Sequence, residues 1–203
     1  MAIKGEETKT KILDAAKQLV MDRGFAGTSI DEIIKGTDVT KGAFFHHFSS
    51  KSDLAEALLN RYAEDDVNLF LHYSEKAKTL SDDPLKQALL FIGMFEIFLE
   101  ELEEPFPGCM FASYIYEGEQ FDPTVHAFIE TSLKAWEQIY EERFDAVLAM
   151  YKPKLRITAK QLAETFVCLL EGAFLVARSR NDTGLIIRQS RQFRKYLEFL
   201  FYD

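Results

Sequence analysis

Apolar residues recur at intervals of three and four along most of the chain, which is the spacing that gives a helix one buried face. In residues 6–23 the recurring positions are Ile12, Ala16, Leu19 and Val20, and Gly24 ends the pattern. The same spacing predicts further helices over residues 28–35, 40–48, 51–78, 84–104, 109–117, 123–148, 159–180 and 185–201. No stretch of the sequence alternates convincingly as a β-strand does, so we predict an all-α fold with about nine helices.

Residues 28–54 contain two short predicted helices joined by a tight turn. Thr28 or Ser29 can cap the first helix, and Asp31 or Glu32, three residues later, can complete a capping box. A Gly-Thr-Asp turn and a threonine cap then begin the second helix. This is the layout of the DNA-binding helix-turn-helix, although an ordinary helical hairpin in an all-α core has the same pattern.

The same stretch resembles the amino-terminal DNA-binding module of TetR-type transcriptional repressors. The matching positions are Thr28-Ser29, Ile33-Ile34, Val39-Thr40, Gly42, Phe45, His47-Phe48, Lys51 and Leu54. Asp38, Ile34 and Phe45 depart from the family pattern, and Phe45 lacks the tyrosine hydroxyl that commonly touches a phosphate in that family. The resemblance implies a three-helix DNA-binding domain over residues 1–50 and a helical ligand-binding and dimerisation domain over residues 51–203.

The resemblance also implies which residues meet DNA. The second helix of the motif enters the major groove, where Lys41 and His46 are candidates for contact with bases or phosphates. Gly42 and Ala43 are small enough to permit close approach, and Phe45 lies on the same helix. The remaining candidates, which would hold the DNA backbone, are Thr28, Thr40, His47 and Lys51.

The overall charge does not suggest a nucleic-acid-binding protein. The chain has 24 basic and 33 acidic side chains in 203 residues, whereas a basic surface is expected where DNA binds. The acidic excess lies mainly after residue 60, however. Between residues 33 and 52, Lys35, Lys41 and Lys51 are accompanied only by Asp38, so the proposed DNA-binding stretch is locally positive.

Nothing in the sequence indicates export, a membrane span or a catalytic site. The two cysteines form neither a disulfide framework nor a metal-binding pattern, and the adjacent His46 and His47 do not have the spacing of metal ligands. The first residues lack the apolar core of a signal peptide, and the longest apolar run, residues 88–95, is far shorter than the roughly 18 residues of a membrane span. We expect a cytoplasmic protein that is not an enzyme and needs no cofactor.

Aromatic residues are abundant in the second part of the chain. The 18 phenylalanines exceed what a minimal core requires, and such side chains often line a ligand cavity. By resemblance, the carboxy-terminal helices hold a small-molecule inducer, and the candidate ligand-binding residues are Phe91, Phe95, Phe98, Cys109, Phe111, Tyr114, Phe128, Trp136, Tyr140 and Phe166. A phenylalanine-rich core without a ligand is the alternative.

Cys109 has two interpretations. It follows Pro-Phe-Pro-Gly at a predicted helix start, where the helix dipole lowers a thiol pKa, and the segment resembles the Gly-Cys segment of a TetR subgroup that includes electrophile and oxidant sensors. The acidic residues just before it would raise the pKa, and an inert small residue is then the simpler interpretation. Cys168 lies within a helix beside Phe166 and Leu169. We therefore expect Cys168 to be buried and Cys109 to react first.

The last two helices carry apolar stripes that we expect to be too wide for one subunit to cover. An isologous four-helix bundle would bury them in a homodimer, with interface candidates Leu162, Phe166, Leu169, Ala173, Ile186, Phe193, Leu197 and Leu200. The sequence thus predicts a ligand-responsive repressor, released from a double-stranded DNA operator by a small molecule or an electrophile. The alternative is an all-α small-molecule-binding protein or enzyme that has lost DNA binding.

Overall fold

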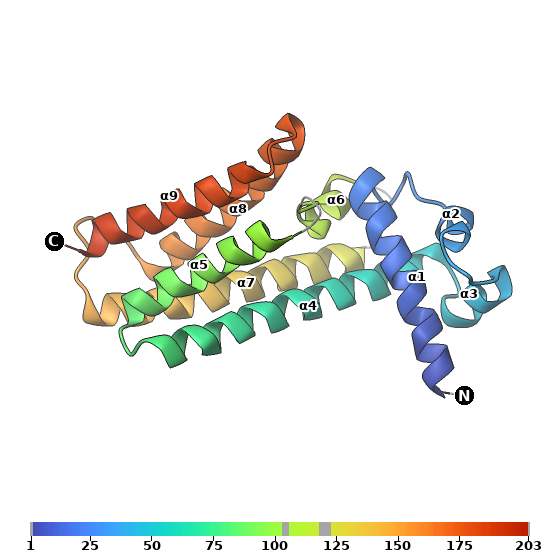
Figure 1. Cartoon of the computed structure of the whole chain (residues 1–203), viewed down its shortest axis with the longest axis horizontal. Coiled ribbons are helices and arrows are strands. Elements are labelled where there is room, and N and C mark those ends of the chain that lie inside the picture. The colour runs from blue at the N-terminus through green and yellow to red at the C-terminus, as the bar shows by residue number, and fades with distance from the viewer. Residues whose placement is uncertain (1, 103–105, 118–122, 203) are drawn as a thin grey trace. The chain divides into compact units, whose positions relative to one another are not determined.

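The described residues fold into helices joined by short turns. The computed structural model describes residues 2–102, 106–117 and 123–202, and these form nine helices and no strand (Figure 1): α1 (Ala2–Arg23), α2 (Ile30–Lys35), α3 (Lys41–His47), α4 (Lys51–Leu80), α5 (Pro84–Glu101), α6 (Met110–Tyr116), α7 (Pro123–Met150), α8 (Ala159–Arg180) and α9 (Gly184–Phe201). The all-α prediction is confirmed. Within this part of the chain, none of the helices combines the length and the apolar character that a membrane span requires.

The chain divides into two compact units, the first formed by residues 1–65 and 109–130 and the second by residues 66–108 and 131–203. This division does not follow the boundary expected at residue 50. The helix α4 is 30 residues long and contains no glycine or proline, so it continues from the first unit into the second. The first unit also includes α6, which lies far along the chain.

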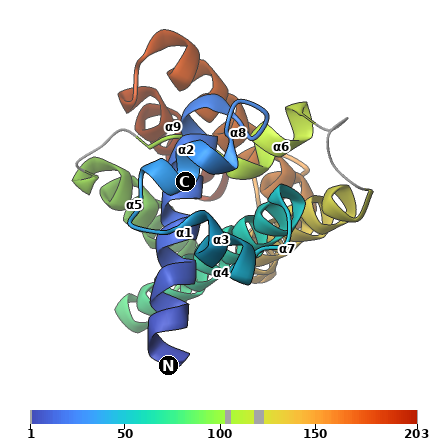
Figure 2. The same ribbon diagram turned by 90° about the vertical axis from the view of Figure 1, so that its right-hand side faces the viewer.

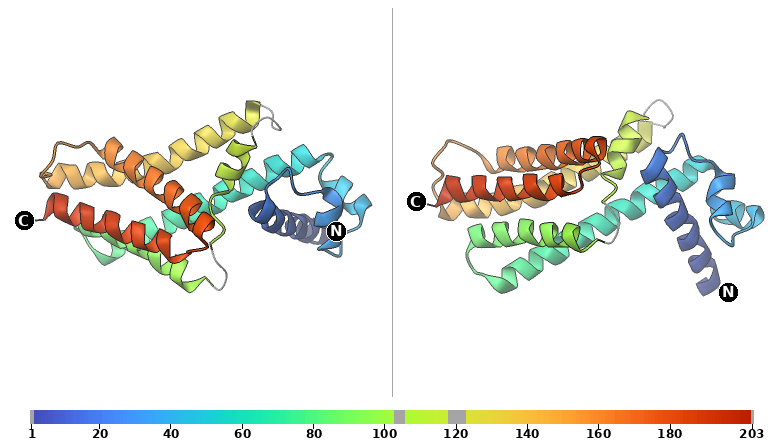
Figure 3. Two further views of the ribbon diagram at one scale, coloured as in Figure 1. Left: turned by 90° about the horizontal axis from the view of Figure 1, so that it is seen from above. Right: turned by 45° about the horizontal axis from the view of Figure 1, so that its top comes forward.

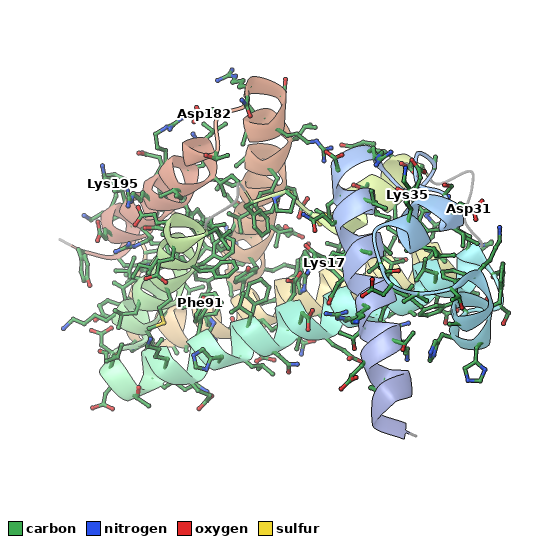
Figure 4. The ribbon with its side chains drawn as sticks, turned by 45° about the vertical axis from the view of Figure 1, so that its right-hand side comes forward. Lys17, Asp31, Lys35, Phe91, Asp182 and Lys195 are labelled. Carbon is green, nitrogen blue, oxygen red and sulfur yellow. The ribbon has the colours of Figure 1, made fainter. Side chains whose placement is uncertain are left out.

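In the first unit, α1, α2 and α3 pack on one another, and α6 packs on α1 (Figures 1 and 2). The apolar positions that predicted these helices form their core, which includes Ile12, Ala16, Val20, Ile33, Phe44, Phe48, Leu54 and Leu58. The start of α4 belongs to the same core. On its margin, the Lys17 ammonium lies 5.6 Å from the ring centroid of Tyr62 (Figure 4).

In the second unit, α8 and α9 are antiparallel neighbours, and α9 also packs on α5 (Figure 3). Asn181 ends α8 in the left-handed conformation, with φ of 51°, which asparagine tolerates better than most residues. The amide of Asp182 then donates to the Ala177 carbonyl at 2.9 Å. Residues 181–184 therefore cap α8 and reverse the chain into α9.

A buried charged network joins α5 to α9. Glu96 is only 3% exposed; it accepts hydrogen bonds from Arg194 Nη1 at 3.0 Å and from Ser190 Oγ at 3.2 Å. Arg191 Nε lies 3.5 Å from the same carboxylate, and Arg191 also pairs with the exposed Glu100. A buried carboxylate needs such partners because it has lost its water.

Asp83 caps α5 and links it to the end of α7. Its Oδ1 accepts from the Leu85 amide at 2.8 Å, and the Tyr151 hydroxyl donates to Oδ2 at 2.6 Å. These hydrogen bonds hold the pKa of the Asp83 carboxyl below its ordinary value, the Tyr151 bond having the largest effect.

We expect Asp83→Ala to lower the free energy of unfolding by about 1 kcal/mol near neutral pH, the usual value of a lost helix cap. A carboxyl whose pKa is lower in the folded state stabilises the fold above its unfolded-state pKa, and this contribution is lost as the pH falls through the folded-state value. The difference from the wild type should therefore shrink in acid, below the ordinary aspartate pKa of about 3.9. Urea unfolding across this range measures it, with the exposed neighbour Asp82→Ala as the control. A difference that stays constant with pH contradicts the assignment.

Candidate nucleic-acid interface and ligand site

The start of α2 is fixed by a capping box formed by Ser29 and Glu32. Ser29 Oγ accepts from the Glu32 amide at 3.2 Å, and the Ser29 amide donates to the Glu32 carboxylate at 3.0 Å. The Ser29 hydroxyl also donates to the Glu32 carboxylate at 2.7 Å, and this bond, followed by the one from the Ser29 amide, holds the pKa of Glu32 below its ordinary value. Of the two possible capping boxes, the structure therefore forms the one with Ser29 and Glu32, and Asp31 is left exposed.

Helix α3 presents an exposed face of small and polar side chains together with Phe45. Thr40 caps it, with its side chain accepting from the Ala43 amide at 3.2 Å. Phe44 and Phe48, which are four residues apart, are buried beneath it. The exposed positions are Thr40, Lys41, Gly42, Phe45 and His46, and Ala43 and His47 are half-buried. The structure thus brings most of the predicted DNA-binding residues onto one short helix and its cap.

Lys41 has a partner that the sequence analysis did not assign. Its ammonium lies 2.8 Å from Asp31 Oδ1 on α2, and both side chains are exposed; Asp31 is labelled in Figure 4. An exposed ion pair of this kind is worth about 0–1 kcal/mol. Lys41 can therefore exchange Asp31 for a phosphate at little cost. In the sequence, this ion pair was indicated only by the opposite charges of Asp31 and Lys41, which lie before and after the turn between α2 and α3.

Two of the predicted DNA contacts are directed into the protein instead. Thr28 is buried, and its hydroxyl donates to the Gly24 carbonyl at 2.9 Å. Lys51 is half-buried; its ammonium donates to the Phe25 carbonyl at 2.6 Å and lies 4.3 Å from the Phe25 ring centroid. This burial lowers the pKa of Lys51. Thr28 is thus outside the exposed face, and the Lys51 ammonium is engaged within the module.

Several predicted ligand-binding residues form a chain of ring contacts in the second unit. The Tyr140 ring lies 5.9 Å from Phe91 and 5.0 Å from Phe166. Phe70, which was not predicted, lies 6.0 Å from Trp136. Phe95 stacks on the half-buried Phe98 at 6.3 Å. Burial is the main reason that the pKa of Tyr140 is raised, and Figure 4 shows Phe91 among these packed side chains.

Arg143 brings a positive charge to this aromatic cluster. Its guanidinium carbon lies 4.0 Å from the Phe91 ring centroid, a typical cation–π distance. Its Nε is buried and makes no hydrogen bond to the described residues, and burial lowers the pKa of the guanidinium. Arg143 was not among the predicted ligand-binding residues, because a lone arginine on a helix has no distinguishing sequence pattern.

The other predicted ligand-binding residues lie in the first unit. Phe111 contacts Tyr62 at 5.2 Å, and Tyr114 contacts Phe25 at 5.4 Å. Cys109 is buried at the start of α6, and Phe128 is half-buried on α7. The candidates are therefore divided between the two units.

The predicted dimer interface needs a correction. The side chains that fill the interior of the subunit are almost fully buried, and so cannot supply contact area to a partner: Leu162, Phe166, Ile186, Phe193, Leu197 and Leu200. An open groove does run along α8 and the start of α9, lined by Arg156, Ile157, Gln161, Glu164, Thr165, Cys168, Leu169, Gly172, Ala173, Val176, Arg180, Leu185 and Gln189. Of the predicted interface residues, only Leu169 and Ala173 line it.

The expected accessibility of the two cysteines was wrong. Cys109 is buried and Cys168 is exposed. Cys168 is in the middle of α8, as predicted, but on the side that faces the groove, whereas Phe166 points into the core. The order of reactivity inferred from sequence, with Cys109 first, therefore has no support from exposure.

Comparisons with known proteins agree with this layout. Residues 12–58 match the model of bacterial regulatory proteins of the tetR family, and residues 84–192 match the C-terminal domain of LmrA/YxaF-like transcriptional regulators. The biofilm operon icaADBC negative transcriptional regulator IcaR of Staphylococcus aureus is 24% identical over 186 residues, which is 92% of each chain. The transcriptional repressor NemR of Escherichia coli is 38% identical over 56 residues, or 28% of each chain. A solved TetR-family regulator from Agrobacterium tumefaciens has a TM-score of 0.82 at 23% identity, with 97% of this chain and 99% of that chain covered.

Proposed function

Because the chain belongs to the TetR family of bacterial transcription regulators, we propose that it acts as a homodimeric repressor that a small molecule releases from its operator. The observation that carries the DNA-binding part is the exposed face of α3. There Lys41, Gly42 and His46 stand clear of the core formed by Phe44 and Phe48. We assign the chain no catalytic activity and place its action in the cytoplasm.

Lys41 and His46 are the proposed contacts to bases or phosphates. Gly42 allows DNA to come close to the helix backbone. The space beside it is open, since even an added Cβ atom would meet no protein atom within 4 Å. Thr40 and the half-buried His47 are proposed to hold the DNA backbone. The names of IcaR and NemR, a negative regulator and a repressor, support repression as the direction of regulation.

The proposed inducer site is the aromatic cluster of the second unit, around Phe91, Trp136, Tyr140 and Phe166. Its buried rings offer an apolar surface, and Arg143 provides a polar group beside them. A ligand shifts a regulator off DNA only if it binds the released conformation better. We therefore propose that the inducer fits the cluster best in a conformation that does not match the operator.

We propose that the groove along α8 and α9 is where two subunits meet. Its lining is partly apolar, through Leu169, Ala173 and Val176. Leu175 on α8 and Phe199 on α9 are large apolar side chains that are 57% and 62% exposed, as expected of a surface that a second copy covers.

Lys41→Ala is expected to weaken DNA binding and leave the fold intact, because the side chain is exposed and its only ion pair with a described residue is the exposed one with Asp31. Loss of one phosphate contact should also reduce the slope of log affinity against log salt concentration by about one unit. The measurement is a titration, at several salt concentrations, with a duplex that the protein selects from a random-sequence pool. Lys152→Ala, an exposed lysine of the second unit, is the matched control. Unchanged affinity and slope would remove Lys41 from the interface, and failure to select any duplex would favour a protein that has lost DNA binding.

A further inference from the structure

We propose that Glu117, the residue after α6, is a positioning residue for DNA binding: it holds the connection between α1 and α2 in place. The inference rests on the proposed DNA-binding function. The segment that matches the amino-terminal family model ends at residue 58. Glu117 therefore lies outside that segment, in a distant part of the chain.

A hydrogen bond ties Glu117 to this connection. The Ala26 amide donates to Glu117 Oε2 at 2.7 Å, across 91 residues of sequence. The connection itself is tight, because the Thr28 amide donates to the Phe25 carbonyl at 3.2 Å and the Thr28 hydroxyl donates to Gly24. A bond to a charged acceptor is stronger than one between neutral groups, so Glu117 adds a strong restraint to this segment.

The backbone at Gly24 is shaped to admit this carboxylate. Gly24 has φ of +80°, and a Cβ atom placed there would lie 1.9 Å from Glu117 Oε1. Any other residue would therefore meet both a strained backbone and the carboxylate. This observation is independent of the hydrogen bond, and it also indicates that the carboxylate and the connection fit each other closely.

Two further contacts hold the same connection. Lys51 donates to the Phe25 carbonyl, and the Tyr114 ring lies 5.4 Å from the Phe25 ring. Lys51 and Glu117 have opposite charges and interact electrostatically. The connection is thus held by α6, by the residue after it and by the first residue of α4.

The position of this connection matters for DNA binding, because the connection leads directly into α2, the first helix of the helix-turn-helix. Ser29, the cap of α2, follows Thr28 at once. Helix α2 packs on α3, and its Asp31 pairs with Lys41 of α3. A connection that is free to move would therefore loosen the start of α2, and with it the orientation of the helix that meets DNA.

The test compares Glu117→Ala with Glu117→Gln in the full-length protein, using the duplex selected from a random-sequence pool. Glu117→Ala should lower the affinity about tenfold, the effect of losing one charge-assisted hydrogen bond, and leave the salt slope unchanged. Glu117→Gln removes the same charge but keeps an oxygen that accepts from Ala26, so it should recover most of the affinity. Glu56→Ala, an exposed glutamate of α4 in the same unit, is the control. It should leave the affinity unchanged or raise it, because the removal of a negative charge alone favours DNA.

Gly24→Ala gives a second readout. It should weaken DNA binding in the wild type, and its additional cost should be smaller in Glu117→Ala, where the carboxylate is gone and only the backbone strain remains. The inference is overturned if Glu117→Ala binds as tightly as the wild type, if Glu117→Gln loses as much as Glu117→Ala, or if the effects of Gly24→Ala and Glu117→Ala are simply additive. If only the thermal stability falls, Glu117 is structural and not a positioning residue. A wild type that selects no duplex overturns the proposed function and this inference together.

Discussion

Replacing Glu96 with alanine is expected to lower the free energy of unfolding by about 2–3 kcal/mol, because the groups that donate to this buried carboxylate would lose their acceptor. Glu96 is 3% exposed, and its carboxylate is the acceptor for Arg194 Nη1 and Ser190 Oγ. Arg194 Nε is already buried without a hydrogen bond to the described residues. Without Glu96, the Arg194 side chain, which is 34% exposed, would remain half-buried with its countercharge removed.

Chemical unfolding at one fixed protein concentration measures this effect, because the proposed dimer would make stability depend on concentration. Glu100→Ala is the matched control: Glu100 is an exposed partner of Arg191, and such pairs contribute about 1 kcal/mol or less. Replacing Glu96 and Arg194 together with leucine should restore much of the loss, since an apolar pair carries no desolvation cost. If Glu96→Ala costs no more than Glu100→Ala, the network is not a stabilising link between α5 and α9.

Gly172→Arg is expected to give a monomer. Gly172 lines the groove along α8, and a Cβ atom added there would meet nothing within 4 Å. The subunit can therefore accommodate the new side chain, whereas a partner that covers the groove would bury an unpaired charge. Such a charge costs about 3 kcal/mol or more, which weakens dimerisation at least about a hundredfold.

Sedimentation at micromolar concentration distinguishes the two states, and circular dichroism checks that the helices remain. His72→Arg adds the same side chain to an exposed position of α4 and should leave the dimer intact. If Gly172→Arg is as dimeric as His72→Arg, the groove is not the interface. A wild type that is monomeric under the same conditions would show that no stable dimer forms.

The helices could be predicted because their signals are local. Asp83-Pro84 and Ser29 with Glu32 mark helix starts by capping chemistry that depends on a few adjacent residues. The exposed face of α3 also follows from sequence, since Phe44 and Phe48 define the buried side of a short helix. A local sequence pattern does not reveal which distant residue a side chain will contact. The contacts of Lys51 with Phe25, of Glu117 with Ala26 and of Glu96 with Arg194 all join residues far apart in the chain.

The dimer interface shows a related limit. Apolar spacing identifies which side of a helix is buried but does not say what covers it. Phe166 and Phe193 lie on the predicted stripes, yet their rings stack on each other at 4.7 Å within the subunit. The surface available to a partner is instead the side with Gly172 and Cys168. The same reasoning explains the cysteines, because Cys168 differs from Phe166 by two positions, which places it on another side of the helix.

The composition of the first unit has a consequence for fragments and chimeras. A fragment that ends after residue 65 would contain the whole helix-turn-helix but would lack α6. It would expose the faces of Phe25 and Tyr62 that pack on Tyr114 and Phe111, and it would leave the Ala26 amide without Glu117. Such a fragment would tend to aggregate through these rings. To transfer the proposed operator specificity of this protein to another regulator, one would have to move residues 109–130 together with the amino-terminal helices. The alternative is to redesign the contacts between these two segments.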